Sequence, residues 1–309
     1  YRALKFKSVE TSAMTSQTQK PHRGTVVVED AEILIHQGFP GHQYVLRVKA
    51  PEISRRAVPG QFAHIHCGAE LPMRRPLSIM RVDRNAGWVE FLYKVFGAGT
   101  SILSRRSEGE VINLMGPIGQ PFVLHDEHPR ALLIGGGVGI PPMVFLADNI
   151  KENHKGFKPF VIMGSEVPFP FDARPSQFVV PGMPAGVIGA MPLMEDWGIP
   201  SRLASTQGYA GCFEGYVTDL ARSWLDALDA SQRTEVEVFA CGPHPMLEAV
   251  AKMAYDYSLP CQVSLEEFMA CAVGGCAGCV VEVQTDTGPA MKRVCVDGPV
   301  FDASTVFTR

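Results

Sequence analysis

The sequence lacks both an excess of basic residues and any long apolar segment. Its 309 residues include 28 Lys and Arg against 32 Asp and Glu, a net charge of −4. Nucleic acids and anionic membranes attract basic surfaces, so neither is expected as a partner. The most apolar stretch, residues 131–147, is broken near its middle by glycines and prolines, whereas a membrane-spanning helix needs about 20 mostly apolar residues. We therefore expect a buried strand and a glycine-rich loop there.

An apolar leader is also lacking at the beginning of the chain. Residues 1–23 are polar, with several Lys, Ser, Thr and Gln, and have no long apolar centre. They do not resemble a secretory signal. We interpret them as a flexible leader or a cloning remnant and leave them out of the fold.

The cysteines lack the even spacing of a disulfide framework. Four of the eight are scattered, and the other four lie within residues 271–295. In a chain without a secretory signal, such crowding indicates metal binding in a cytoplasmic protein.

The pattern of strands and helices predicts three domains after the leader. Short β-rich runs separated by Pro and Gly turns over residues 24–128 predict a small antiparallel β-barrel. Over residues 129–258 strands alternate with helices, which predicts an α/β domain with a parallel sheet. Residues 259–309 form a small cysteine-bearing unit. The clearest expected strands are 44–48, 62–66, 88–93, 131–134, 160–163 and 236–240, and the clearest helices are 143–151, 218–228 and 245–257.

The crowded cysteines have the spacing of a two-iron cluster site. Four residues separate Cys271 from Cys276, two separate Cys276 from Cys279, and fifteen more precede Cys295. Plant-type 2Fe–2S ferredoxins combine the same x4 and x2 spacing with one distant cysteine. Glycines between the cysteines allow the backbone to fold closely around a cluster. The alternative is a structural zinc site, although zinc sites usually pair two short CxxC-type segments.

A first motif on the expected barrel suits a flavin dinucleotide. Arg75-Pro76-Leu77-Ser78 follows the strand that begins near residue 62. An arginine can pair with a pyrophosphate through its planar guanidinium, and Ser78 lies on the same strand face as Pro76. Such a motif also occurs by chance, so it needs support from a second one.

The second motif follows about twenty residues later. Gly97-Ala98-Gly99-Thr100 opens an expected short helix. Glycine amides at the beginning of a helix can bind an anion, although glycines often only make turns. The order of the two motifs on one barrel favours a flavin site containing Gly97, Gly99 and Thr100.

A glycine-rich loop between an apolar strand and a helix favours binding of a nicotinamide dinucleotide. The loop contains Gly135, Gly136, Gly137, Gly139 and Pro141. Glycines here let a pyrophosphate approach the backbone at the beginning of a helix. The spacing differs from the common GxGxxG pattern, so the strand–loop–helix context is what makes it informative.

Two later strand ends add to this site. Glu166 follows the second strand of the α/β domain, where an acidic residue binds a ribose 2′-hydroxyl and repels a 2′-phosphate, so NADH is favoured over NADPH. Cys241 and Gly242 follow another strand, and ligands of open parallel sheets bind at such ends. Cys241 is therefore expected to face the nicotinamide. The alternatives are a merely solvated Glu166 and a helix-start turn without ligand contact at Cys241.

These motifs, in this order, resemble the ferredoxin–NADP reductase superfamily, and more narrowly the electron-transfer subunits of NAD-dependent dihydroorotate dehydrogenases. The resemblance covers about residues 24–300 and is most specific over residues 264–279. It implies that Arg75, Pro76, Leu77 and Ser78 hold FAD, with Ser78 near the reactive flavin edge. It also implies that Gly97, Gly99 and Thr100 bind the FAD pyrophosphate, and that the four clustered cysteines bind a 2Fe–2S cluster.

The resemblance further implies a partner and a pathway. The partner is an FMN-containing catalytic subunit that oxidises dihydroorotate in pyrimidine biosynthesis, so a hetero-oligomer is expected. Phe268 stands where the family usually has arginine, and Leu77 where more distant reductases have a flavin-stacking tyrosine. His64 and His66 share a strand face and are a second, weaker candidate for metal binding, against packing or solvent exposure.

The sequence therefore predicts an NADH-dependent oxidoreductase that transfers electrons through FAD and a 2Fe–2S cluster, with Ser78 and Cys241 beside the site of hydride transfer. A reductase module of a hydrogenase, a sulfide or ferredoxin–NADP reductase, or an electron-bifurcating complex is a second hypothesis. A non-enzymatic iron–sulfur sensor or assembly subunit is a third.

Overall fold

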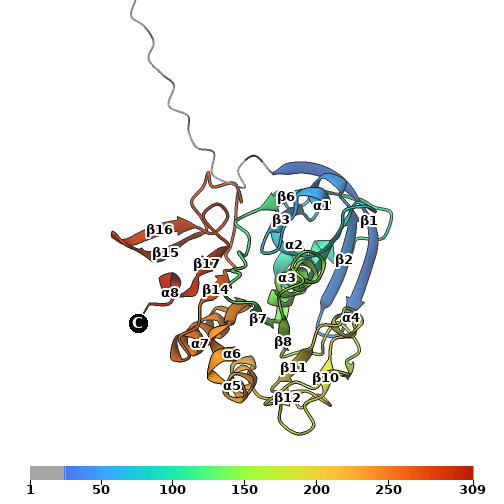
Figure 1. Cartoon of the computed structure of the whole chain (residues 1–309). Coiled ribbons are helices and arrows are strands. Elements are labelled where there is room, and N and C mark those ends of the chain that lie inside the picture. The colour runs from blue at the N-terminus through green and yellow to red at the C-terminus, as the bar shows by residue number, and fades with distance from the viewer. Residues whose placement is uncertain (1–23, 25, 309) are drawn as a thin grey trace, which may run out of the picture.

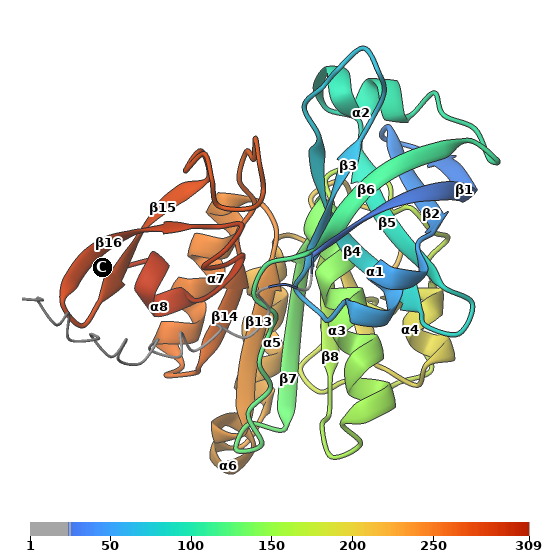
Figure 2. The same cartoon turned by 90° about the horizontal axis from the view of Figure 1, so that it is seen from above.

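The computed structural model describes residue 24 and residues 26–308 of the chain. The expected leader, residues 1–23, lies outside the described residues. Figure 2 shows the barrel in blue and teal and the C-terminal unit in red at opposite ends of the view, with the strands and helices of a central sheet between them. In Figure 1 the same parts carry their element labels.

The N-terminal part is a closed antiparallel barrel of strand order β1-β2-β5-β4-β3-β6. Side chains that alternate along these strands fill its interior, as a period of two requires. Ile33, Leu46, Ile65, Ile79 and Phe91 are each at most 1% exposed. The strands are β1 (Val27–Phe39), β2 (Gln43–Lys49), β3 (Phe62–His66), β4 (Arg75–Asp83), β5 (Trp88–Lys94) and β6 (Val111–Ile118).

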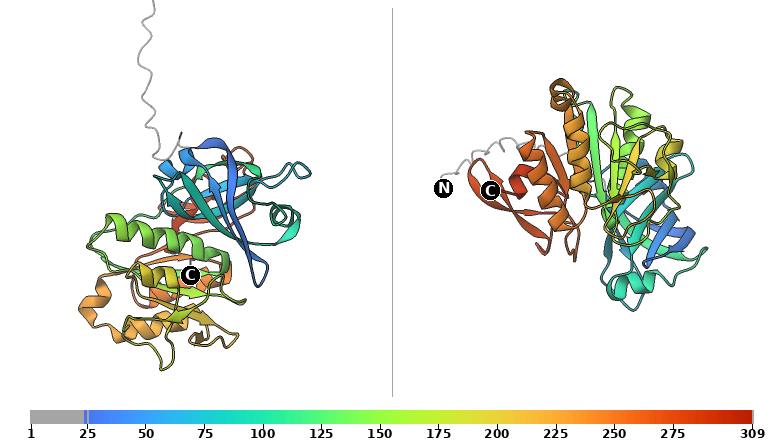
Figure 3. Two further views of the ribbon diagram at one scale, coloured as in Figure 1. Left: turned by 90° about the vertical axis from the view of Figure 1, so that its right-hand side faces the viewer. Right: turned by 90° about the horizontal axis from the view of Figure 1, so that it is seen from below.

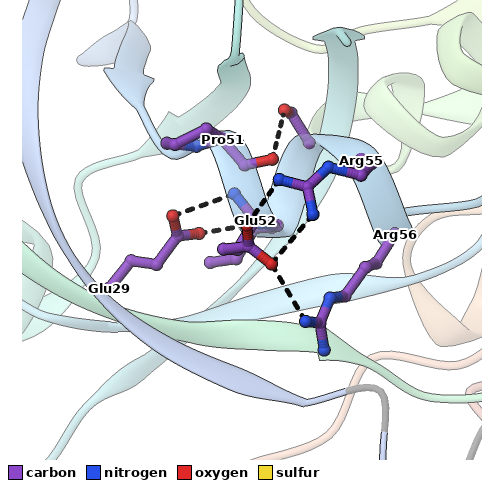
Figure 4. Close-up of polar contacts among 7 residues, drawn as sticks. Glu29, Pro51, Glu52, Arg55 and Arg56 are labelled. Atoms are coloured by element: carbon purple, nitrogen blue, oxygen red, sulfur yellow. Dashed lines mark hydrogen bonds and ion pairs between the residues drawn. The ribbon is translucent and has the colours of Figure 1, made fainter.

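A short helix, α1 (Pro51–Arg56), contacts strands β1, β4, β5 and β6, and its buried Ile53 packs in the same core as the barrel interior. Its N-cap residue provides no side-chain hydrogen bond, so β1 supplies one instead. The carboxylate of Glu29 accepts hydrogen bonds from the amides of Glu52 at 2.9 Å and Ile53 at 2.7 Å (Figure 4). Glu52 in turn pairs with Arg55 and Arg56. This capping satisfies donors that the beginning of a helix otherwise leaves free.

The central sheet has the strand order β12-β11-β8-β7-β13-β14-β17. All neighbouring strands are parallel except β14 and β17, which are antiparallel. Figure 3 (left) shows the barrel standing above this region. The strands are β7 (Arg130–Gly136), β8 (Phe160–Gly164), β11 (Ser201–Ser205), β12 (Phe213–Glu214), β13 (Val236–Cys241), β14 (Cys261–Ser264) and β17 (Val300–Asp302).

Helices cover both faces of this sheet. Ala131 and Leu133 of β7 pack in one core with α3 (Ile140–Asn153) and α4 (Pro192–Asp196). Leu132 and Ile134, on the opposite face, pack with α5 (Val217–Ala227) and α7 (His244–Asp256). The antiparallel barrel and the parallel-sheet domain expected from the sequence are therefore confirmed.

The remaining elements are short. A 3₁₀ turn (Gly137–Gly139) joins β7 to α3, and α2 (Gly97–Leu103) follows β5. β9 (Arg174–Pro175) and β10 (Gly189–Ala190) form a small separate sheet, and α6 (Ala230–Thr234) follows α5. The C-terminal unit contains a hairpin of β15 (Val280–Thr285) and β16 (Gly288–Arg293), and α8 (Ala303–Val306) follows β17.

The central sheet contains residues from both sides of position 258, where the sequence places a domain boundary. β14 pairs with β13, and β17 pairs with β14. The cysteine-bearing loop and the β15–β16 hairpin therefore project from a segment that leaves the sheet after β14 and returns to it at β17. None of the helices within residues 26–308 is long and apolar enough to cross a membrane.

Candidate functional site

A cavity of about 1000 Å³ lies where the barrel meets the segment that precedes the cysteine loop. Strands β4 and β5 and helix α2 form one wall, and residues 264–270 form the other. Cofactor sites in proteins usually measure about 300–1000 Å³, so this cavity suits a large cofactor. From the sequence motifs it brings together Arg75, Pro76, Leu77, Ser78, Gly97 and Thr100.

Arg75 joins the two barrel motifs. Its Nη1 donates hydrogen bonds to the main-chain oxygens of Met73 and Arg74, both at 3.0 Å. A Cβ at Gly99 would lie only 2.6 Å from Arg75 Nε, so the glycine provides the space in which the guanidinium lies against α2. The cationic group is thereby held in the cavity wall, in a position that suits a pyrophosphate.

The second barrel motif is the first turn of α2 itself. Gly97 has a φ of +77°, which favours glycine. The Thr100 hydroxyl accepts a hydrogen bond from the amide of Phe96 at 2.7 Å and lies 3.0 Å from its carbonyl oxygen. Phe96 also lines the cavity, and its side chain is 82% exposed. An aromatic ring left open beside a large cavity is consistent with a ligand surface.

The glycine-rich loop after β7 packs tightly against the end of β13. A Cβ at Gly139 would lie 2.2 Å from the carbonyl oxygen of Cys241, and one at Gly136 would lie 2.4 Å from the sulfur of Met246. Gly137 has a φ of +55° and no neighbour within 4 Å of a Cβ. The loop therefore combines close packing on its inner side with an open glycine, as a dinucleotide-binding turn needs.

Other residues assigned to the nicotinamide site surround this loop. Gly135 and Gly242 are tightly packed. A Cβ at Gly135 would lie 2.9 Å from Ile140 Cα, and one at Gly242 would lie 2.6 Å from Met246 Cε. Pro141 is buried in the first turn of α3. Glu166 is exposed just beyond β8. Val138, within the loop, reaches the large cavity, which places the two expected cofactor sites next to each other.

Cys241 contacts a carboxylate that the sequence motifs did not include. Its Sγ lies 3.9 Å from Oε1 of Glu266. Glu266 as a whole residue is exposed, but burial of its carboxyl group beside Cys241 raises its pKa. Burial together with the nearby Glu266 raises the pKa of Cys241. Both groups therefore tend to keep their protons. Glu266 lines the cavity, whereas Cys241 is fully buried behind it.

The missed carboxylate had a weak signal in the sequence. Glu266 comes two residues after β14, which is the parallel neighbour of β13. Carboxyl ends of neighbouring parallel strands meet at one edge of a sheet. The pairing of these two strands brings Glu266 to Cys241, and the sequence alone did not reveal that pairing.

The β15–β16 hairpin brings two of the clustered cysteines together. The amide of Val294 donates a hydrogen bond to the carbonyl oxygen of Cys279 at 2.9 Å. The Sγ atoms of Cys279 and Cys295 then lie 3.3 Å apart, and both residues are buried.

The other two cysteines lie in a loop whose backbone curves around them. The amide of Cys276 donates a hydrogen bond to Cys271 Sγ at 3.4 Å. Ala272, Gly274 and Ala277 all have φ between +53° and +82°. Left-handed backbone costs a non-glycine residue about 1–2 kcal/mol. Turns of this kind aim successive amides at an anionic group, which accounts for the loop's conformation.

Cys271 and Cys295, one from each pair, differ in acidity. Burial raises the pKa of Cys271, but the amides of Val273, Cys276 and Gly275 outweigh it and lower the pKa to about 6. Burial and the neighbouring thiol raise the pKa of Cys295 to about 12. The amides around Cys271 thus favour the thiolate, which is the form that binds metals.

The four thiols fit a two-iron cluster better than a single ion. Over the described residues, no three His, Cys, Asp or Glu side chains gather closely enough to hold one metal ion, and this includes His64 and His66. Two pairs of thiols match a 2Fe–2S cluster with four cysteine ligands, whereas zinc needs four ligands around one centre. His64 is fully buried, and no hydrogen bond of good geometry to either ring nitrogen is found among the described residues.

The flavin motifs and the cysteine loop meet at the same cavity. Ala270, which precedes Cys271, and Gly278, which precedes Cys279, both line it. They face the wall that carries Arg75 and Ser78.

Comparisons with known proteins agree with this arrangement. Residues 266–307 match the model of the iron–sulfur cluster binding domain of dihydroorotate dehydrogenase B. Among solved structures, an NADH-dependent reduced ferredoxin–NADP oxidoreductase, studied for flavin-based electron bifurcation, is similar with a TM-score of 0.72 and 25% identity, covering 89% of both chains. A ferredoxin reductase of carbazole 1,9a-dioxygenase shares the fold, with a TM-score of 0.58, 20% identity and coverage of 76% of this chain and 67% of that one.

Curated relatives are similar over almost the whole chain. The dihydroorotate dehydrogenase B (NAD+) electron transfer subunit of Desulforamulus reducens is 32% identical over 89% of this chain and 96% of its own length. The corresponding subunit of Listeria monocytogenes is 35% identical over 80% of this chain and 87% of its own. With relatives of this identity and coverage, the chain belongs to the family of electron transfer subunits of dihydroorotate dehydrogenase B (NAD+).

Proposed function

We propose that this chain transfers electrons between NAD(H) and an FMN-containing subunit that oxidises dihydroorotate. The observation that carries the proposal is the shared cavity: flavin-binding motifs form one wall, and residues adjacent to two clustered cysteines form the other. When bound, FAD exchanges hydride with NAD(H) and single electrons with a 2Fe–2S cluster. Family membership supports the assignment of the partner.

The chain's own residues then have distinct roles. Arg75, with Gly97 and Thr100, binds the FAD pyrophosphate, while Pro76, Leu77 and Ser78 lie along the flavin. Gly99 leaves space for Arg75. The protein supplies binding, orientation and electrostatics, since the cofactors carry the redox chemistry.

At the nicotinamide site, the glycine loop from Gly135 to Gly139, with Pro141 and Gly242, receives the NAD pyrophosphate, and Glu166 binds a ribose hydroxyl. Cys241 and Ser78 border the site of hydride transfer. Glu266 lies beside Cys241, and its raised pKa favours the uncharged carboxyl next to the proposed site of hydride transfer.

The cluster is bound by Cys271, Cys276, Cys279 and Cys295. In this proposal residues 24–128 bind FAD, residues 129–258 bind NAD, and residues 259–309 carry the cluster. The chain works in the cytoplasm as part of a hetero-oligomer. Cys279 Sγ and Cys295 Sγ lie 3.3 Å apart, and the amide of Cys276 donates to Cys271 Sγ. Because a 2Fe–2S cluster needs all four thiolates, loss of one cysteine is expected to release iron while FAD remains bound.

The test is anaerobic purification of the chain from a native-like host, without a tag that selects for one partner. Copurified proteins are then identified, and the sample is assayed for FAD, FMN, iron and sulfide. We expect an FMN-containing subunit and dihydroorotate-dependent reduction of NAD⁺. Cys295→Ser should abolish that activity and the cluster but retain FAD. Copurification of a hydrogenase or bifurcating enzyme instead would move the chain to another pathway, and zinc in place of iron would contradict the electron-transfer role.

A further inference from the structure

Gly278 belongs both to the cysteine loop and to the wall of the flavin cavity. It lies between Cys276 and Cys279, is exposed, and lines the cavity. Its amide donates a hydrogen bond to Cys276 Sγ at 3.4 Å. One residue therefore contacts a cluster ligand and also faces the space assigned to FAD.

The fold itself does not require glycine at this position. The φ of Gly278 is not among the positive values of the described backbone. A Cβ there would meet only Cys276 Sγ, at an ordinary contact distance of 3.4 Å. A glycine that neither the backbone nor packing demands is typical of a place where a ligand approaches the main chain closely.

We propose that the flavin comes closest to the iron–sulfur ligands at Gly278. Electrons cross there through the hydrogen bond from the Gly278 amide to Cys276. The inference rests on the proposed function and adds the route within the chain. Ala270 also lines this wall and directly precedes the cluster ligand Cys271, but it already carries a methyl group. A side chain at position 278 would hold the flavin edge away from the loop.

The electrons balance as follows. Hydride from NADH brings two electrons to FAD. They would cross one at a time, each reducing one Fe(III) of the cluster to Fe(II), and the cluster would pass each to the FMN of the partner subunit before the next arrives. The protons taken up by the flavin return to solvent.

Three variants test the route. Gly278→Ala and Gly278→Val add one and three carbon atoms at the proposed contact. Gly156→Ala is the control for a glycine-to-alanine change, because Gly156 also lacks a positive φ, has no described neighbour within 4 Å of a Cβ, and lies outside both the cysteine loop and the cavity.

The measurement uses the cofactor-replete chain mixed rapidly with NADH under anaerobic conditions. Flavin bleaching is followed by absorbance, and cluster reduction by freeze-quench EPR. We expect Gly278→Ala to slow cluster reduction several-fold and Gly278→Val to slow it further. Flavin bleaching, FAD and iron content, the EPR line shape and the cluster midpoint potential should match the wild type, and Gly156→Ala should behave as wild type throughout.

Equal rates of cluster reduction in wild type and Gly278→Val would overturn the inference and leave the proposed function intact. An equal slowing in Gly156→Ala would also overturn it, since the effect would then not depend on the contact at position 278. If Gly278→Val does not retain the cluster, the Gly278→Ala rate decides. A wild-type chain without FAD or iron would refute the proposed function together with the route.

Discussion

The two glycine-rich loops of this chain use glycine for different reasons. In the loop after β7, a Cβ at Gly139 would lie 2.2 Å from the main chain of β13. In the cysteine loop, Gly275 has no neighbour within 4 Å and Gly278 has only a sulfur at 3.4 Å. Gly139 of the first loop is needed so that the loop can pack against β13, although Gly137 beside it is open. Gly275 and Gly278 of the second loop leave open space, although Gly274 beside them is packed, with a Cβ only 2.6 Å from Val296 Cγ2.

Two loops of similar composition can therefore respond in opposite ways to substitution, one in stability and the other in ligand binding. Tight packing against main-chain atoms cannot relax by moving a flexible side chain. Open positions tolerate a methyl group in the folded protein, so their glycines affect ligands rather than stability. The following predictions separate the two cases.

The largest effect is expected for Gly139→Ala. The new Cβ would overlap the carbonyl of Cys241, so β13 and the loop must separate, at a cost of about 3 kcal/mol, the upper part of the range for overpacking. Urea unfolding of the purified protein measures the change. A stability within error of the wild type would show that the loop is not held by this contact.

Gly137→Ala should have a smaller effect on stability and a clear one on nucleotide binding. Its φ of +55° costs a residue with a Cβ about 1–2 kcal/mol. Because the position is otherwise open, the methyl group would face the bound dinucleotide and raise the KM for NADH. Unfolding and steady-state kinetics with an artificial acceptor separate these effects, and an unchanged KM would argue against contact with the nucleotide.

Glu266→Gln should change how stability depends on pH. Burial raises the pKa of Glu266 in the folded protein, so the folded state binds a proton more tightly than the unfolded state. Wild-type stability from this group is present below the unfolded pKa of about 4.5 and is lost as pH rises toward the folded value. The variant should therefore gain stability relative to wild type as pH rises. A difference that does not vary with pH would contradict the raised pKa.

Gly275→Ala should have the smallest effect. With an ordinary φ and open space around the Cβ, the change in stability should stay within about 0.5 kcal/mol, as for most surface substitutions. Thermal unfolding and iron content measure it. A large loss of either would show that the two loops do not differ in the way described.

Much of the fold could be predicted from local patterns. The strand at residues 62–66 was predicted with its observed bounds, and the other strands and helices given above as expected end within three residues of the observed ends. β4, β6 and β11 were not among the expected strands. The alternation of period two and the strand–helix rhythm are local signals. The short strand β17 and its return to β14 depend on distant pairing and could not be inferred locally.

The candidate site shows the same division. Cysteine spacing and the arginine and glycine motifs are continuous in sequence and could be recognised directly. The contact between Cys241 and Glu266 depends on the pairing of β13 with β14, and the meeting of Ser78 with Gly278 at one cavity depends on how the barrel packs against the C-terminal segment. The roles assigned to individual residues remain predictions.

The most direct test of the account is an EPR spectrum of the anaerobically purified, cofactor-replete chain before and after addition of NADH. The account predicts that NADH produces the signal of a reduced 2Fe–2S cluster, and that Cys276→Ser loses this signal while its flavin is still bleached. Bleaching of the wild-type flavin without any iron–sulfur signal would contradict the claim that one chain couples two-electron exchange with NAD(H) to one-electron transfer. Zinc bound to the cysteines would contradict it as well.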